Sequence, residues 1–141
     1  MSQRYSIVLA EDCRADIYLV RKALAQSGLD HELLVVEDGG GAMSLIDRIG
    51  RDVPRPDVLL MDLNLPKVDG AELIRLFKQN PDCKSVPVIV VTSSDSPKDR
   101  ARTAELGISA YFRKPSELTE FMRLGGLVRD VLNVTLPETI P

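Results

Sequence analysis

Short runs of aliphatic residues alternate along the chain with longer segments in which apolar residues recur every three or four positions. The short runs predict strands buried on both faces, and the longer segments predict amphipathic helices. The predicted strands cover residues 5–10, 33–36, 57–62, 86–92 and 109–112, and the predicted helices cover 15–27, 42–49, 71–79, 97–106 and 116–132. Five such alternations predict an α/β fold with a parallel sheet and helices on both of its faces.

Glycines disturb this pattern in two places. Gly39, Gly40 and Gly41 stand at the start of the second helix and are poor helix formers, so we expect that end of the helix to be loose. The pair Gly125-Gly126 falls inside the last helix, where each glycine costs about 1 kcal/mol relative to alanine. Either the helix bends at this pair or another segment packs closely against its backbone, and we expect the bend.

The composition restricts the classes of protein to which the chain can belong. A length of 141 residues fits one domain, and 44% hydrophobic with 28% charged residues is ordinary for a globular protein. A net charge of -3 with scattered Lys and Arg argues against a nucleic-acid partner. No segment resembles a signal peptide or a membrane span, so we expect a cytoplasmic protein without a membrane partner. Two distant cysteines and the single His31, in a polar link, are too few for a zinc site.

Reactive side chains follow four of the five predicted strands. Glu11-Asp12 comes after the first strand, Asp62 ends the third, Thr92 ends the fourth, and Lys114 follows the fifth. If the second strand lies at the edge of the sheet, these four strand ends converge on one pocket. Each feature alone has an ordinary structural interpretation, such as a helix cap or an ion pair. Together they favour a functional site.

The three carboxylates predict a site for a hard cation. Oxygen ligands from Glu11, Asp12 and Asp62 suit Mg²⁺, and a divalent ion also relieves the repulsion between them. A flavin or mononucleotide site is disfavoured, because the acidic first loop repels phosphate. With Mg²⁺ bound, Asp62 is a plausible nucleophile towards an activated phosphoryl group. Mg²⁺, Lys114 and Thr92 would then neutralise the oxygens of the transferred group.

In these residues the chain resembles a response-regulator receiver domain of two-component signalling. The resemblance extends from Tyr5 to about Leu132. It rests on Glu11-Asp12, Asp62-Leu63-Asn64-Leu65-Pro66-Lys67-Val68-Asp69-Gly70, Thr92 and Tyr111-Phe112-Arg113-Lys114-Pro115. Within the family the chain is most similar to stand-alone phytochrome-associated response regulators, through Glu11-Asp12, Asp30-His31-Glu32-Leu33, Arg55-Pro56, Leu63-Asn64-Leu65-Pro66-Lys67 and Lys78-Gln79-Asn80-Pro81.

The resemblance implies a fold and a domain organisation. The fold is a flavodoxin-like (βα)5 doubly wound sandwich, with a five-stranded parallel sheet in the order 2-1-3-4-5. The receiver domain is expected to cover residues 1–132, and residues 133–141 to form a short tail with no output domain.

The resemblance also implies a role for each site residue. Asp62 is expected to accept the phosphoryl group, and Lys114 to bridge to it, with a cis bond between Lys114 and Pro115. Thr92 and Tyr111 are expected to act as the switch pair. The Mg²⁺ ligands are expected to be the side chains of Asp12 and Asp62, the backbone carbonyl of Asn64, and Glu11 through water. Glu11 replaces the aspartate that is commoner in the family.

The implied function is that of a single-domain response regulator in a phosphorelay, which catalyses only its own phosphorylation and dephosphorylation. Its expected partners are a sensor histidine kinase, with the phytochrome type as a candidate, or a phosphotransfer protein, and a homodimer is a further candidate. Two alternatives stay open. A haloacid-dehalogenase-type phosphotransferase also uses a strand-end aspartate, but it has a second aspartate where this chain has Asn64. A receiver-like module could instead bind its partners without phosphorylation.

Overall fold

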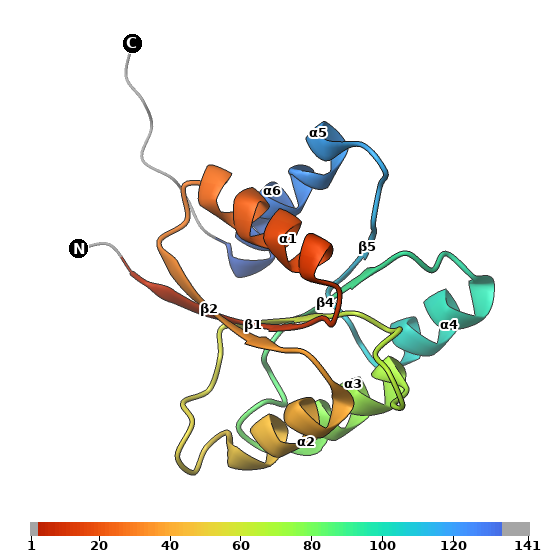
Figure 1. Ribbon diagram of the computed structural model, residues 1–141. Coiled ribbons are helices and arrows are strands. Elements are labelled where there is room, and N and C mark those ends of the chain that lie inside the picture. Colours follow the sequence, from red (N-terminus) through yellow and green to blue (C-terminus); the bar gives the residue numbers. More distant parts are fainter. Residues whose placement is uncertain (1–2, 134–141) are drawn as a thin grey trace.

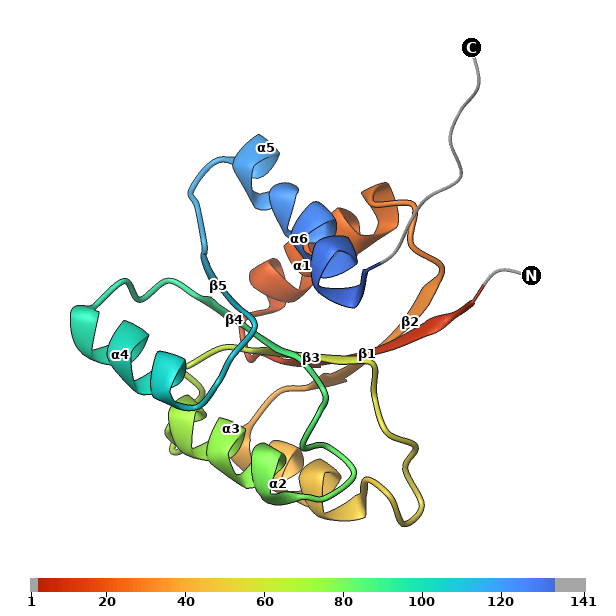
Figure 2. The same cartoon turned by 180° about the vertical axis from the view of Figure 1, so that it is seen from behind.

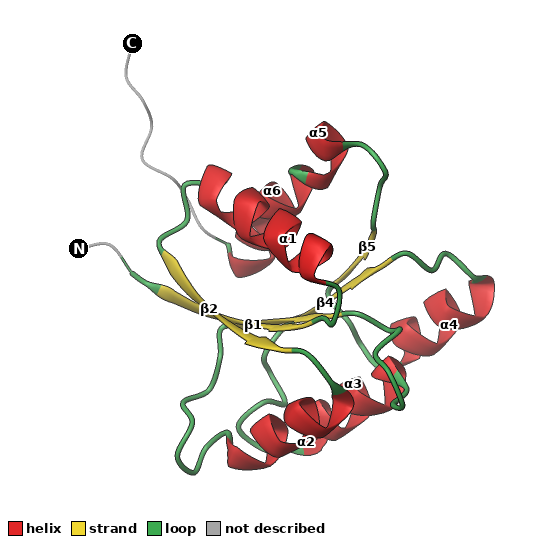
Figure 3. Ribbon diagram, in the orientation of Figure 1, coloured by secondary structure: helices red, strands yellow, loops and turns green. Residues whose placement is uncertain are grey.

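The computed structural model describes residues 3–133 and shows one parallel five-stranded sheet in the order β2-β1-β3-β4-β5. All four strand pairings are parallel, so the predicted fold class and strand order are confirmed. The helices α1, α5 and α6 cover one face of the sheet and α2, α3 and α4 cover the other (Figures 1 and 2). Figure 3 shows how strands and helices alternate along the chain. Among residues 3–133, no helix has the length and apolar character that crossing a membrane requires.

The elements follow one another with short connections. In chain order they are β1 (Tyr5–Ala10), α1 (Arg14–Gln26), β2 (His31–Val36), α2 (Gly39–Arg48), β3 (Val58–Met61), α3 (Gly70–Gln79), β4 (Val88–Thr92), α4 (Pro97–Glu105), β5 (Ala110–Arg113), α5 (Leu118–Phe121) and α6 (Arg123–Leu132). The central strands β1, β3 and β4 send alternate side chains into two cores, one on each face of the sheet. In β3, for example, Leu59 and Met61 enter one core while Val58 and Leu60 enter the other. This double burial explains the uninterrupted apolar runs of the sequence.

Helix α2 begins at Gly39, so the helix includes the three glycines that were expected to form a loose start. Asp38 caps the helix by accepting a hydrogen bond from the N–H of Gly41 at 2.6 Å, and such a cap stabilises a helix start. A Cβ atom at position 39 would lie 2.0 Å from Cγ2 of Val68. The first glycine therefore allows the loop before α3 to pass close to α2, and the absence of a side chain here serves a tertiary contact.

The last helical segment also differs from the prediction. The single helix that was expected to begin near Ser116 is divided into two helices. The short helix α5 comes first, and a turn at Met122 separates it from α6. Helix α6 then runs without interruption through Gly125 and Gly126, so the predicted bend at the glycine pair is wrong. The alternative explanation holds for Gly125, where a Cβ atom would lie 2.4 Å from the carbonyl oxygen of Ala23 in α1.

Two local expectations fail near the ends of strands. His31 does not lie in a link but opens β2, with its ring Nδ1 2.7 Å from the carbonyl oxygen of Leu29. The Lys114–Pro115 bond is trans, and residues 3–133 contain no cis peptide bond. The trans form is the intrinsically preferred isomer of such a bond.

Candidate functional site

Asp62 lies directly after β3, at the carboxyl edge of the sheet. Its backbone N–H donates to the carbonyl oxygen of Ala10 at 3.0 Å, which ties it to the end of the neighbouring strand β1. Its side chain is buried, with 4% of the residue exposed. One carboxylate oxygen accepts the N–H of Asn64 at 3.1 Å and the other accepts from Nζ of Lys114 at 3.1 Å. The carboxylate is therefore fixed in place from two sides.

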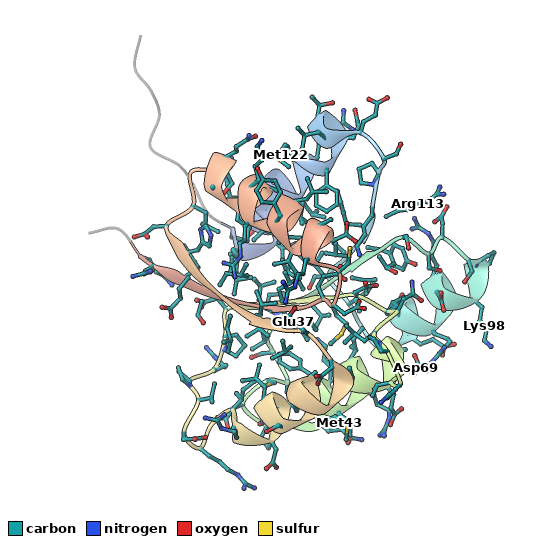
Figure 4. The ribbon with its side chains drawn as sticks, in the orientation of Figure 1. Glu37, Met43, Asp69, Lys98, Arg113 and Met122 are labelled. Atoms are coloured by element: carbon teal, nitrogen blue, oxygen red, sulfur yellow. The ribbon has the colours of Figure 1, made fainter. Side chains whose placement is uncertain are left out.

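The loop after Asp62 closes tightly onto the start of α3. A Cβ atom at Gly70 would lie 2.5 Å from Cα of Leu63 and 2.8 Å from the carbonyl oxygen of Asp62, so this position requires glycine. Asp69, labelled in Figure 4, caps α3 by accepting the N–H of Ala71 at 3.0 Å, and it also pairs with Arg102 of α4. The loop that carries Asp62 is thus anchored to both α3 and α4.

The acidic pair after β1 faces Asp62. Carboxylate oxygens of Glu11, Asp12 and Asp62 lie within 4.8 Å of one another. Glu11 is 1% exposed and accepts the backbone N–H groups of Asp12 and Cys13 at 3.1 and 3.2 Å, whereas Asp12 is exposed. Such a set of oxygen ligands, open to water on one side, fits Mg²⁺, which usually keeps several water ligands.

Lys114 joins the acidic residues from the end of β5. Its Nζ lies 2.5 Å from Oε1 of Glu11, 2.8 Å from Oδ2 of Asp16 and 3.1 Å from Oδ2 of Asp62. Its backbone N–H donates to the carbonyl oxygen of Thr92 at 2.8 Å, which fixes the backbone of Lys114 beside β4. Asp16, in the first turn of α1, is a site residue that the sequence interpretation missed. In the sequence, its role is indicated only by its position in the first turn of α1, shortly after the acidic pair.

Burial and charge set the protonation of these groups. Burial raises the pKa of Glu11 to about 7, against the effect of the Lys114 ammonium. Burial also acts on Asp62, but the Asn64 N–H, Glu11 and Lys114 hold its pKa below the ordinary value. Burial disfavours the charged form of Lys114, yet hydrogen bonds to Asp16 and Glu11 and the charge of Asp62 raise its pKa. Asp62 is thus ionised and Lys114 protonated at neutral pH, as a carboxylate nucleophile beside a cation requires.

Thr92 and Tyr111 form a second layer beside the carboxylates. The fully buried Thr92 hydroxyl accepts hydrogen bonds from Nδ2 of Asn64 at 3.2 Å and from the N–H of Ser94 at 3.3 Å. The Tyr111 hydroxyl donates to the carbonyl oxygen of Ser94 at 2.7 Å, and the Arg100 guanidinium lies 4.3 Å from the centre of its ring. Ser94 therefore connects the predicted switch residues, and this role of Ser94, like that of Arg100, was not predicted from the sequence.

The structure brings the predicted residues to one edge of the sheet. Glu11, Asp12 and Asp62 form the acidic cluster, Lys114 contacts two of these three carboxylates, and Thr92 reaches the cluster through Asn64. Tyr111 lies one contact further away, through Ser94. A buried ionised carboxylate between a cation site and an ammonium group can attack an electrophilic phosphorus atom, because both cationic groups neutralise the incoming oxygens.

Comparison with known proteins agrees with this geometry. Residues 7–124 match the family model for the response regulator receiver domain. The chain is 41% identical over 120 residues to Response regulator Rcp1 of Synechocystis sp., a similarity that covers 84% of this chain and 82% of Rcp1.

Two crystal structures share the fold over nearly the whole chain. The phosphorylated cyanobacterial phytochrome response regulator RcpA superposes with a TM-score of 0.85 at 36% identity, over 96% of this chain and 100% of that chain. The Mn(2+)-bound form of response regulator Rcp1 superposes with a TM-score of 0.83 at 40% identity, over 95% and 99% of the two chains. The chain therefore belongs to the family of response regulator receiver domains.

Proposed function

We propose that this chain is a single-domain response regulator of a phosphorelay. It accepts one phosphoryl group on Asp62 from the phosphohistidine of a sensor histidine kinase or a phosphotransfer protein, in a reaction that depends on Mg²⁺. One observation carries this proposal: the buried Asp62 carboxylate lies between Lys114, at 3.1 Å, and the carboxylates of Glu11 and Asp12. The family match and the metal-bound form of the relative Rcp1 support it.

Each residue has a defined part in the transfer. A carboxylate oxygen of Asp62 forms a bond to phosphorus as the bond from phosphorus to the histidine nitrogen breaks. The leaving nitrogen keeps the electron pair of that bond. Lys114 exchanges its contact with Asp62 for an oxygen of the transferred group, which it can do with little movement because its backbone is held beside β4 and its Nζ already contacts Asp62.

The acidic cluster is the proposed metal site. Its ligands are the side chains of Asp12 and Asp62, the backbone carbonyl of Asn64, and Glu11 through water. Bound there, Mg²⁺ supplies the positive charge that allows a phosphoryl group to approach several carboxylates. Glu11 is held by two backbone N–H groups just before α1, so its longer side chain is fixed where it would orient a water ligand of the metal.

Thr92 and Tyr111 form the proposed switch. The Thr92 hydroxyl accepts two hydrogen bonds and still carries one proton that it can donate to a phosphoryl oxygen. A rotation of Thr92 towards that oxygen changes the space and the hydrogen bonding next to Ser94 and Tyr111. The charge added at Asp62 is thus transmitted to the surface formed by α4 and β5.

The output of this regulator is association with other proteins. The proposed phosphoryl donor is a cytoplasmic sensor histidine kinase, of the phytochrome type by analogy with the phytochrome response regulator RcpA, and self-association into a homodimer is a further proposed outcome. Phosphotransfer profiling against the histidine kinases of the host identifies the donor: the cognate kinase labels Asp62 fastest, and equal labelling by all kinases contradicts a dedicated pair.

Intact-mass measurement tests the proposed chemistry. Incubation with acetyl phosphate and Mg²⁺ is expected to add one phosphoryl group per chain, and Asp62→Asn or removal of Mg²⁺ with a chelator is expected to abolish the gain. Asp57→Asn is the matched control, because Asp57 directly precedes β3, at the other end from Asp62, and accepts a hydrogen bond from the N–H of Ser6 at 2.7 Å. This variant is expected to be labelled like the wild type.

Two results would contradict the proposal. If Asp62→Asn were still labelled, the acceptor would be another residue. If neither acetyl phosphate nor a histidine kinase labelled the wild type, the chain would be a binding module that works without phosphorylation. Repeated turnover of small phosphate esters would instead favour a phosphotransferase of the haloacid dehalogenase type.

A further inference from the structure

We propose that Asp16 is a positioning residue, which holds the Lys114 ammonium in place while phosphoryl transfer occurs at Asp62. This inference rests on the proposed function and extends it to a residue outside the acceptor, metal and switch sets. Asp16 lies in the first turn of α1, and its Oδ2 lies 2.8 Å from Nζ of Lys114. The two residues are 98 positions apart in the sequence, so the contact connects α1 to the end of β5.

The number of N–H groups on the ammonium makes the third partner significant. A protonated lysine has three N–H donors, and Nζ of Lys114 contacts three carboxylates, those of Glu11, Asp16 and Asp62. Only 9% of the Lys114 side chain is exposed, so water has little access to an N–H group that loses its partner. Each of the three carboxylates therefore satisfies one donor in a buried setting.

The three partners have different fates during the reaction. Asp62 becomes bonded to phosphorus, and Glu11 is assigned to the metal site. Asp16 is outside the group of carboxylates that lie within 4.8 Å of one another, so the geometry assigns it to neither the phosphoryl group nor the cation. It is the one partner of Lys114 whose hydrogen bond stays the same before and after transfer.

The position of Asp16 also opposes a repulsive force. The Lys114 ammonium would be repelled by a divalent cation held by Glu11, Asp12 and Asp62, because both groups are positively charged and lie at the same acidic cluster. Asp16 attracts Lys114 from the first turn of α1, and its side chain is 26% exposed, which leaves it partly shielded from water. Asp16 therefore keeps Lys114 within reach of the phosphoryl oxygens when the metal is present.

The first test measures the position of Lys114 and does not depend on phosphorylation. The wild type and Asp16→Ala are acylated with an N-hydroxysuccinimide ester, and the rate at each lysine is read by peptide mass analysis. We expect Lys114 to react about fivefold faster in Asp16→Ala, since an ammonium that loses one partner is less protected, while Lys22 reacts at the same rate in both proteins. An unchanged rate at Lys114 would overturn the positioning role.

The second test measures phosphoryl transfer from acetyl phosphate with Mg²⁺. We expect Asp16→Ala to label about fivefold more slowly than the wild type, and Asp16→Asn, which keeps an acceptor oxygen, to recover part of the rate. Asp47→Ala is the control, because it removes an exposed helical carboxylate that pairs with Arg51 on α2. If Lys114 were acylated faster but the rate of phosphoryl labelling did not change, the claim that Asp16 assists phosphoryl transfer would be overturned. A wild type that is never labelled would instead overturn the proposed function.

Discussion

Two adjacent glycines of α6 are predicted to respond in opposite directions to the same substitution. A Cβ atom at Gly125 would lie 2.4 Å from the carbonyl oxygen of Ala23 and 2.9 Å from Cβ of Ser27, both in the C-terminal part of α1 or just after it. A Cβ atom at Gly126 would have no neighbour within 4 Å. Alanine at Gly125 therefore pushes α6 away from α1, whereas alanine at Gly126 enters open space.

The expected free energies follow from two opposing effects. Replacing a glycine inside a helix by alanine stabilises the helix by about 1 kcal/mol, and Gly126→Ala should gain most of this. Forcing an extra methyl group into a packed contact costs about 1–3 kcal/mol. At Gly125 the nearest atom is the backbone carbonyl oxygen of Ala23, which cannot rotate away as a side chain can. The cost of the extra methyl group should therefore exceed the gain in helix propensity. We therefore expect Gly125→Ala to lower the free energy of unfolding by about 1–2 kcal/mol.

Urea unfolding followed by circular dichroism measures both effects. With an m-value of about 2 kcal/mol/M for a domain of this size, the unfolding midpoint should fall by roughly 0.5–1 M in Gly125→Ala. In Gly126→Ala it should rise by roughly 0.3–0.5 M, and the m-value should not change. A midpoint for Gly125→Ala equal to or above that of the wild type would refute the close approach of α6 to α1.

Two further predictions concern titratable groups. Burial raises the pKa of the Cys83 thiol to about 11, while Cys13 is exposed. Iodoacetamide at pH 8 should therefore alkylate only Cys13 in the folded protein and both thiols in urea. Double alkylation of the native protein would contradict the buried position of Cys83. The pKa of about 7 at Glu11 means that a proton competes with Mg²⁺ below neutral pH. The Mg²⁺ affinity measured by calorimetry should therefore fall up to about tenfold from pH 8 to pH 6, and a constant affinity would argue against the participation of Glu11.

Much of the fold could be predicted because the information is local. The strands β3 and β4 and the last four residues of β1 are buried on both faces, so each appears in the sequence as a nearly uninterrupted apolar run. The predicted helix over residues 97–106 agrees with α4, which begins at Pro97 behind a local cap, because Ser96 accepts the N–H of Asp99 at 3.1 Å. In these elements, local chemistry and tertiary packing favour the same conformation.

The errors arise where a distant contact determines the local structure. The start of α2 depends on Val68 lying against Gly39, and the course of α6 depends on Ala23 lying against Gly125. Neither neighbour is visible in the local pattern of glycines, which by propensity alone predicts a loose end and a bend.

The site shows the same division between local and distant information. The strand ends could be predicted because parallel strands deliver their carboxyl ends to one edge of the sheet. Asp16 was missed because it reaches the site from a helix, across 98 positions to Lys114. Ser94 was missed because it takes part through its backbone carbonyl, which accepts from Tyr111, and every residue carries such a group.

The central claim is that the carboxylate at the end of β3 accepts the phosphoryl group, and chemical mapping tests it most directly. Borohydride reduces an aspartyl phosphate to homoserine, so a phosphorylated sample can be reduced, digested and sequenced by mass spectrometry. We predict homoserine at position 62 alone, in a yield equal to the phosphorylated fraction. Homoserine at position 12 or 16, or an unmodified Asp62 in a fully phosphorylated sample, would contradict the account.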